Sequence, residues 1–208
     1  MQRDYQNCKG LYFTLLRLFG PLIKSVFGVK YSGVQNIPNN GSLIVCCNHK
    51  SVYDPILLAI PFRQQVRYMA KSELFTDHGR LARIFLNALG AFPVHRNTGD
   101  LKSIRKALAI LKGRGTVGIF PQGGIVPGNA PFQSKSGVAL LAAKSGAPVL
   151  PAAICCDGPV APFHCVEIRF GKLIPNTLFP GKGAASSAIR RAAEKLADQV
   201  NWLLEGKT

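Results

Sequence analysis

Apolar residues form short continuous runs that alternate with helically spaced ones from residue 42 onward. Runs rich in strand-forming residues lie at 42–47, 66–70, 116–120, 148–156 and 165–170, with a shorter extended piece at 91–95. Helical spacing or helix-start and helix-stop signals mark residues 54–60, 81–89, 100–112, 137–144 and 186–205. Strands alternating with helices predict an α/β fold, with a mixed, largely parallel central sheet flanked by helices.

The N-terminal segment follows a different pattern. Residues 11–29 are rich in Leu and Phe, but Arg17 and Lys24 add charge and Gly20 and Pro21 break the run. The segment is too short and too charged to cross roughly 30 Å of hydrocarbon, and no cleavable signal peptide is evident. We interpret it as two short amphipathic helices, hinged at Gly20 and Pro21, that dock on an anionic membrane interface. Packing of both helices on the protein's own core is an equally good alternative.

These patterns divide the chain of 208 residues into two parts. Residues 1–30 form the predicted membrane-associating segment, and residues 31–208 form the α/β domain. The length excludes a large multidomain assembly.

Charge narrows the class of partner. The chain has 26 Lys and Arg against 10 Asp and Glu, a net charge of +16, while 47% of its residues are hydrophobic. Such a surface favours phosphate groups on lipids, nucleic acids or small substrates. The mean hydropathy of +0.14 favours lipid. No helix-turn-helix, zinc-finger or RNP-type aromatic pattern is visible, so nucleic acid is not an expected partner.

The six cysteines predict neither a metal site nor a disulfide framework. Their spacing contains no Cys-x-x-Cys, and neither Cys nor His shows zinc-ligand spacing. We interpret the cysteines as small apolar residues in buried strands of a protein from a reducing compartment.

Ligands of α/β sheets bind at the carboxyl ends of strands, so the segments after Cys47, Val94 and Phe120 are the candidate sites. His49 leaves the first of these strands, and Asp54, followed by Pro55, starts the next helix. A carboxylate on one imidazole nitrogen orients the ring and stabilises the imidazolium, which makes a histidine a competent general base. By itself this spacing is a weak pattern, since Asp54 is equally suited to cap a helix.

Three further segments offer groups for an anion. Arg96 ends a short strand, where its guanidinium can bind a phosphate with two donors. The glycines after Phe120, including Gly123, expose backbone N–H groups. Lys135 stands at the start of a helix.

The order and spacing of these segments resemble the glycerolipid acyltransferase family, over roughly residues 30–175. The family's Asn-His-x4-Asp block is matched by Asn48, His49 and Asp54, and its phosphate-binding Arg by Arg96. Its Phe-Pro-Glu-Gly-Thr-Arg block lies over residues 120–125, its Lys-x-Gly over residues 135–137, and its proline-bearing block over residues 149–151. This chain departs from the third block, because Gln122 replaces Glu and Gly124 and Ile125 replace Thr and Arg.

The resemblance implies transfer of a fatty acyl group from an acyl thioester, acyl-CoA or acyl-carrier protein, to the hydroxyl of lysophosphatidic acid. His49 would be the general base and Asp54 its orienting partner, while Arg96, Gln122, Gly123 and Lys135 would bind the acceptor. No cofactor and no metal are expected. The expected location is the cytoplasmic face of a membrane, as a peripheral protein. The altered third block leaves two alternatives: the same chemistry on glycerol 3-phosphate or another lysolipid, and a non-catalytic binder of anionic membrane.

Overall fold

The computed structural model describes residues 3–77, 79–94, 101–128, 130–181 and 183–206. Its strands are β1 (Lys30–Ser32), β2 (Leu43–Cys47), β3 (Val66–Lys71), β4 (Phe92–Val94), β5 (Thr116–Ile119), β6 (Val149–Cys155) and β7 (Glu167–Phe170). Its α-helices are α1 (Arg3–Val26), α2 (Asp54–Ala59), α3 (Glu73–Thr76), α4 (Gly79–Ala88), α5 (Leu101–Lys112), α6 (Gly137–Ser145) and α7 (Ser186–Leu204). Short 3₁₀ helices cover Val34–Asn36 and Asn176–Leu178.

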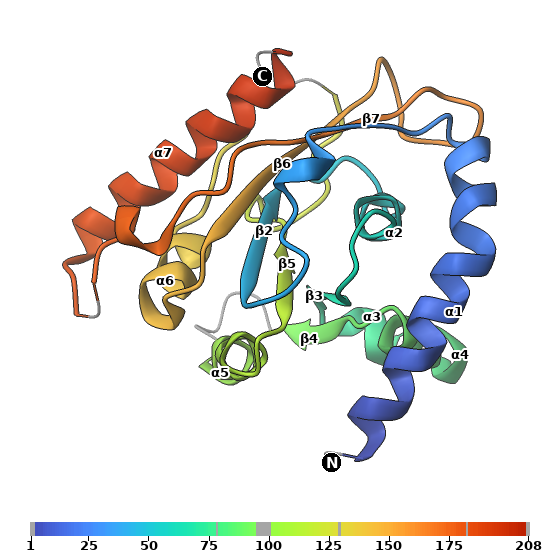
Figure 1. The fold of residues 1–208 in the computed structure, drawn as a ribbon, viewed down its shortest axis with the longest axis horizontal. Coiled ribbons are helices and arrows are strands. Elements are labelled where there is room, and N and C mark those ends of the chain that lie inside the picture. Colours follow the sequence, from blue (N-terminus) through green and yellow to red (C-terminus); the bar gives the residue numbers. More distant parts are fainter. Residues whose placement is uncertain (1–2, 78, 95–100, 129, 182, 207–208) are drawn as a thin grey trace.

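The strands form one sheet in the order β1-β7-β6-β2-β5-β3-β4 (Figure 1). Every pairing is parallel except that of β6 with β7. The α/β fold with a mixed, largely parallel sheet is therefore confirmed. Because β2, β3, β4, β5 and β6 run in the same direction, their carboxyl ends meet at one edge of the sheet.

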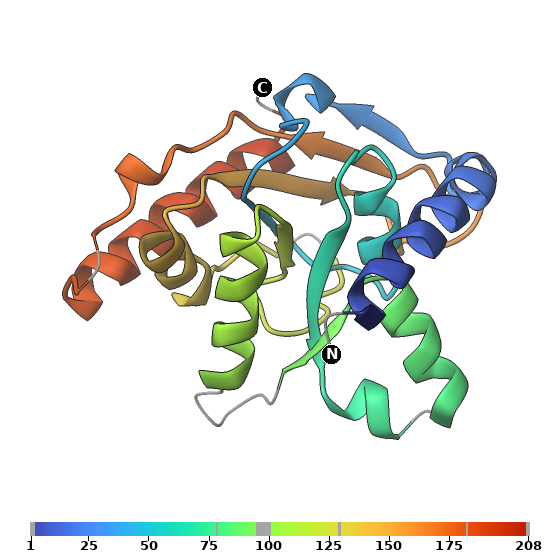
Figure 2. The same cartoon turned by 60° about the horizontal axis from the view of Figure 1, so that its bottom comes forward.

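Helices cover both faces of the sheet, as the two views in Figures 1 and 2 show. Alternate residues of β2 point to opposite faces, as the strand period of two requires. Ile44 and Cys46 pack into a core with α5, α6 and α7, whereas Leu43, Val45 and Cys47 pack into a second core with α1 and α2. Burial on both faces explains why the sequence of β2 is apolar throughout.

The N-terminal segment is one helix, so the prediction of two helices hinged at Gly20 and Pro21 is wrong. Helix α1 continues through Pro21. Tyr12 before the break and Phe27 just after the helix are both buried in the α2-side core, and the Tyr12 hydroxyl accepts a hydrogen bond from Val66 N–H at 3.3 Å. Packing on both sides of Pro21 keeps the helix continuous, although proline has no backbone N–H to donate. The alternative, packing on the protein's own core, is thus observed for this face of α1.

Two further predictions need correction. Asp54 is the first residue of α2 and not its N-cap, a position that Tyr53 occupies without a side-chain cap. Of the described cysteines, Cys46, Cys47 and Cys156 are buried, but Cys155 is half-buried and Cys165 is exposed. Cys165 lies in the loop before β7 and not in a strand.

Candidate active site

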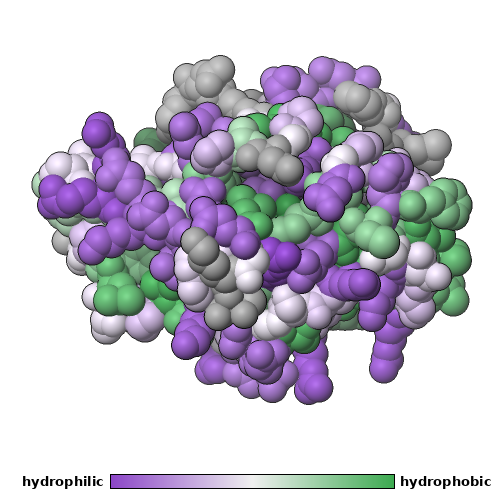
Figure 3. Space-filling view, turned by 90° about the horizontal axis from the view of Figure 1, so that it is seen from above, coloured by the Kyte–Doolittle hydropathy of each residue, from purple (hydrophilic) through white to green (hydrophobic). Residues whose placement is uncertain are grey.

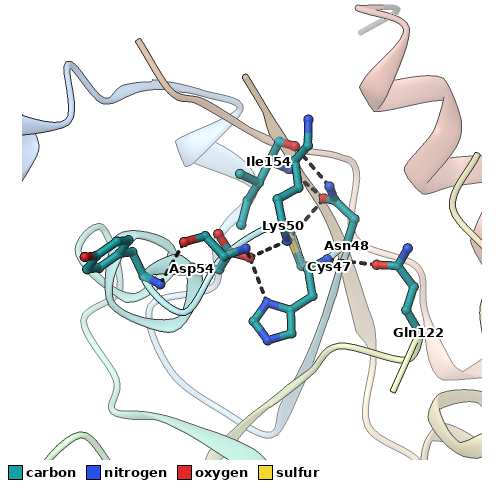
Figure 4. Close-up of polar contacts among 9 residues, drawn as sticks. Cys47, Asn48, Lys50, Asp54, Gln122 and Ile154 are labelled. Carbon is teal, nitrogen blue, oxygen red and sulfur yellow. Dashed lines mark hydrogen bonds and ion pairs between the residues drawn. The ribbon is translucent and has the colours of Figure 1, made fainter. Parts of the chain in front are cut away.

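His49 and Asp54 lie side by side at the carboxyl end of β2. The Nδ1 atom of His49 is 2.7 Å from Oδ2 of Asp54 (Figure 4). The Asp54 side chain is fully buried, while 15% of the His49 side chain is exposed. With Nδ1 paired to the carboxylate, Nε2 is the ring nitrogen left to meet a substrate.

The tight turn between the two residues holds the carboxylate in place. Besides His49, Oδ2 of Asp54 accepts hydrogen bonds from the backbone N–H groups of Lys50 (2.6 Å) and Ser51 (2.8 Å). The carboxylate of Asp54 therefore turns back onto the preceding loop instead of capping its own helix. Hydrogen bonds to a charged acceptor are stronger than neutral ones, so this arrangement fixes the carboxylate rigidly.

Asn48 ties this turn to the neighbouring strand. Its Nδ2 atom donates to Ile154 O at 3.0 Å, and its Oδ1 atom accepts from Ile154 N at 2.7 Å (Figure 4). Asn48 is buried, and the two bonds extend the pairing of β2 with β6 by one residue. The first residue of the Asn-His-x4-Asp block thus anchors the loop that carries His49.

The loop after β5 contacts His49 in two ways. First, the His49 ring stacks on Phe120, with ring centroids 4.2 Å apart, and Phe120 stacks in turn on Tyr68 at 5.7 Å. Gly118 makes room for this stack, because a Cβ atom there would lie 2.4 Å from the Tyr68 ring.

Second, the same loop holds both ends of the His49 backbone unit. The Gln122 side-chain oxygen accepts a hydrogen bond from His49 N–H at 2.9 Å (Figure 4), and Val126 N–H donates to His49 O at 2.7 Å. The side chain of Gln122, which was predicted to bind the acceptor, therefore contacts the backbone of His49. The main-chain position of His49 depends on this loop as well as on β2.

A cavity of about 630 Å³ opens beside Phe120. It is lined by Lys71, Glu73, Val94, Ile104, Ile119, Phe120, Pro121, Gly123, Lys135, Gly137 and others. The Lys135 amine lies over Gly123, since a Cβ atom at that glycine would be 2.6 Å from Nζ. The structure therefore brings Gly123 and Lys135 together, as the sequence suggested. Arg96, the predicted phosphate ligand, lies outside the described residues, and β4 ends nearby at Val94.

Lys71 and Glu73 were not singled out from the sequence, although both line this cavity. They form a half-exposed ion pair at 3.2 Å. A hydrogen bond from the Ser72 hydroxyl, helped by the Glu73 N–H and by Lys71, lowers the pKa of Glu73 to about 2. Glu73 is thus ionised at neutral pH and offsets part of the positive charge of the cavity.

A second cavity, of about 680 Å³, lies on the far side of Gln122 and is lined by Asn48, Lys50, Arg169 and three cysteines. Burial raises the pKa of the half-buried Cys155 and of Cys156. Within the described parts of the chain, no three His, Cys, Asp or Glu side chains gather as a metal site would require.

The fold and these contacts define the class of protein. The crystal structure of the 1-acyl-sn-glycerophosphate (LPA) acyltransferase PlsC from Thermotoga maritima superposes with a TM-score of 0.68, covering 99% of this chain and 84% of that chain at 21% identity. The chain therefore has the α/β fold of PlsC.

Sequence comparison is more specific. A family model described as Acyltransferase matches residues 28–155. A 1-acyl-sn-glycerol-3-phosphate acyltransferase of Bacillus subtilis is 33% identical over 152 residues, which cover 72% of this chain and 70% of that protein. A protein of the same name from Borreliella burgdorferi is 27% identical over 150 residues, 68% of this chain and 57% of that protein. The chain belongs to the acyltransferase family and is an enzyme, which confirms the resemblance drawn from its motifs.

Proposed function

We propose that this enzyme transfers a fatty acyl group from an acyl thioester to the hydroxyl of lysophosphatidic acid, giving phosphatidic acid for phospholipid synthesis. The observation that carries this proposal is the 2.7 Å contact between His49 Nδ1 and Asp54 Oδ2, next to a cavity that contains Lys135. The name shared by the two sequence relatives supports the choice of acceptor.

In the proposed mechanism, Nε2 of His49 takes the proton of the acceptor hydroxyl while its oxygen attacks the thioester carbonyl. Asp54 stabilises the imidazolium that forms. The C–S bond then breaks, and the departing thiolate takes the proton from His49, which leaves an ester and a free thiol. The transfer is direct and needs no cofactor beyond the thioester donor, which is acyl-CoA or acyl-carrier protein.

Lys135, the N–H groups near Gly123 and Arg96 would hold the acceptor phosphate. Because a bound phosphate positions the hydroxyl for reaction, these groups act by orientation. We expect Lys135→Ala to raise the KM for lysophosphatidic acid more than it lowers kcat. The neighbouring exposed Lys144, which does not line the cavity, provides a matched control as Lys144→Ala.

The altered third block favours one second candidate, the same chemistry on another acceptor. Ile125 stands where the family has Arg and is 44% exposed, so this side chain supplies no phosphate contact. The test offers lysophosphatidic acid, glycerol 3-phosphate and a neutral lysolipid in competition, with acyl-CoA or acyl-carrier protein, and identifies the products by mass. Phosphatidic acid as the main product would support the proposal. A preference for another acceptor would support the second candidate instead.

We further propose that the enzyme is a peripheral membrane protein that uses α1. No helix of the described chain is both long and apolar enough to cross a bilayer. However, Leu11, Leu18 and Leu22 share one face of α1, and 48%, 67% and 60% of them, respectively, are exposed. Apolar side chains also gather at the right-hand edge of the space-filling view, the side on which α1 lies (Figure 3). Exposed Arg17 and Lys24 favour anionic lipid.

A further inference from the structure

Phe163 combines two unfavourable features. It lies in the loop between β6 and β7, where 90% of it is exposed. Its φ angle of 67° places it in the left-handed region, which is rare for a bulky L-residue. Such outliers persist where the surrounding structure enforces them, and they gather at functional sites.

The backbone of Phe163 has a clear structural task. Its N–H donates to Val26 O at 2.7 Å, at the last residue of α1. The last carbonyls of a helix lack intrahelical partners, so this bond caps α1. Any non-proline residue could supply the same N–H, and glycine would do so without backbone strain. The cap therefore does not explain the phenyl ring.

Other exposed apolar side chains surround the same end of α1. Leu22, one turn before Val26, is 60% exposed. Phe27, which follows α1, contacts the ring of Tyr53 with centroids 5.0 Å apart. Tyr53 is 41% exposed and its neighbour Val52 is 69% exposed. We call Leu22, Val52, Tyr53 and Phe163 the Phe163 surface.

The Phe163 surface adjoins the active-site loop. Val52 and Tyr53 lie between His49 and Asp54 in the turn that holds the catalytic pair. No Asp or Glu occurs between Tyr5 and Tyr53. Lys24 and Lys30, beside the end of α1, are exposed. Apolar side chains beside exposed cations are the pattern by which proteins bind an anionic lipid interface.

We propose that the Phe163 surface inserts into an anionic bilayer, with the Phe163 ring as its anchor, and so places the His49 turn at the lipid interface. This inference rests on the proposed function in one respect: an acceptor that is a lipid then reaches His49 without leaving the membrane. It extends membrane contact beyond α1 to two loops, one of which carries the catalytic pair.

A fluorescent reporter tests insertion directly. Trp202 is the single tryptophan. In a Trp202→Phe background, Phe163→Trp places the reporter at the proposed anchor. With vesicles of phosphatidylcholine and phosphatidylglycerol we expect a blue shift and quenching by lipids brominated in the acyl chain. Vesicle binding with neither a blue shift nor quenching would overturn the proposal. A blue shift that appears without vesicles and grows with protein concentration would also overturn it, because this surface would then contact a second copy of the chain.

Substitution by glycine separates the ring from the cap. Phe163→Gly keeps the N–H bond to Val26 and relieves the backbone, so we expect an unchanged or higher unfolding temperature with roughly tenfold weaker vesicle binding. Leu178→Ala, which removes another exposed apolar side chain (69%) in the 3₁₀ helix Asn176–Leu178, should bind as the wild type does. Equal binding by Phe163→Gly and wild type overturns the proposal. Since binding is measured without substrate, a failure of the proposed reaction leaves this test unaffected.

Discussion

The hydrogen bond from His49 N–H to Gln122 makes a quantitative prediction about the third sequence block. Gln122→Met keeps the length of the side chain but removes the acceptor that lies 2.9 Å from His49 N. An unsatisfied donor in a largely buried position costs about 1–3 kcal/mol. If that cost appears as misplacement of the His49 ring in the transition state, kcat falls by roughly 5- to 150-fold, at about 1.4 kcal/mol per tenfold. The KM for lysophosphatidic acid should stay unchanged, since the contact is with His49.

Gln122→Glu is the matched variant. Its carboxylate accepts the same hydrogen bond, so kcat should recover to near the wild-type value. Both variants are assayed for phosphatidic acid formation over a range of pH and acceptor concentration.

An independent measurement examines the bond itself. Protein labelled with ¹⁵N-histidine contains 4 labelled backbone amides, and the signal lost in His49→Asn identifies His49. We expect slow hydrogen exchange of this amide in wild type and Gln122→Glu, and faster exchange in Gln122→Met. A raised acceptor KM with unchanged kcat in Gln122→Met would refute the reasoning, and would return Gln122 to the acceptor site predicted from the sequence.

The remaining predictions concern other contacts of the site. Asp54→Asn should lower kcat by on the order of 10³–10⁴-fold with little change in KM, because the imidazolium loses its charged partner; a loss below tenfold would contradict this role. Asn48→Ala leaves the Ile154 N–H and C=O buried and unpaired, so the free energy of unfolding, measured in urea, should fall by about 2–5 kcal/mol, and an unchanged midpoint would refute this. Gly118→Ala places a methyl group 2.4 Å from the Tyr68 ring and should lower the free energy of unfolding, measured by thermal unfolding, by about 1–3 kcal/mol. Activity should fall as well, because the ring stack supports His49. The pKa of Glu73 is lowered from 4.5 to about 2, so its contribution to stability is present above pH 4.5 and disappears as the pH falls towards 2. Between these pH values Glu73→Gln should therefore lose less stability than the wild type. Parallel curves of unfolding free energy against pH would contradict this prediction.

Local patterns were sufficient to predict most of the sheet and its helices. The apolar runs of β2, β5 and β6 are buried on both faces, which leaves a continuous signal in the sequence. Strand β1, with only Lys30–Ser32 and a half-exposed pattern, has no such signal. The antiparallel pairing of β7 with β6 depends on sheet order, which periodicity does not contain.

The N-terminal helix shows how tertiary contacts override a local break. Gly20 and Pro21 are poor helix formers, and the sequence therefore suggested a hinge. Burial of Tyr12 on one side and Phe27 on the other instead holds the two halves in line. Packing of this kind is decided by residues of α2 and β3, which lie far away in the sequence.

The His49–Asp54 pair could be predicted from the sequence because both residues lie in one turn. The contacts that support it were not, because they join distant segments. Gln122 and Val126 reach the His49 backbone across the sheet, and the Tyr68–Phe120–His49 stack requires β2, β5 and β3 to be neighbours. The sequence marked residues 120–125 as important without indicating that they hold His49.

The central claim, acyl transfer to lysophosphatidic acid with His49 as the base, is tested most directly by comparing wild type with His49→Ala. The exposed His164→Ala is the control, and circular dichroism verifies that each variant is folded. With lysophosphatidic acid and acyl-CoA or acyl-carrier protein, wild type and His164→Ala should form phosphatidic acid, and His49→Ala should form essentially none. Product formation by His49→Ala at the wild-type rate would contradict the account.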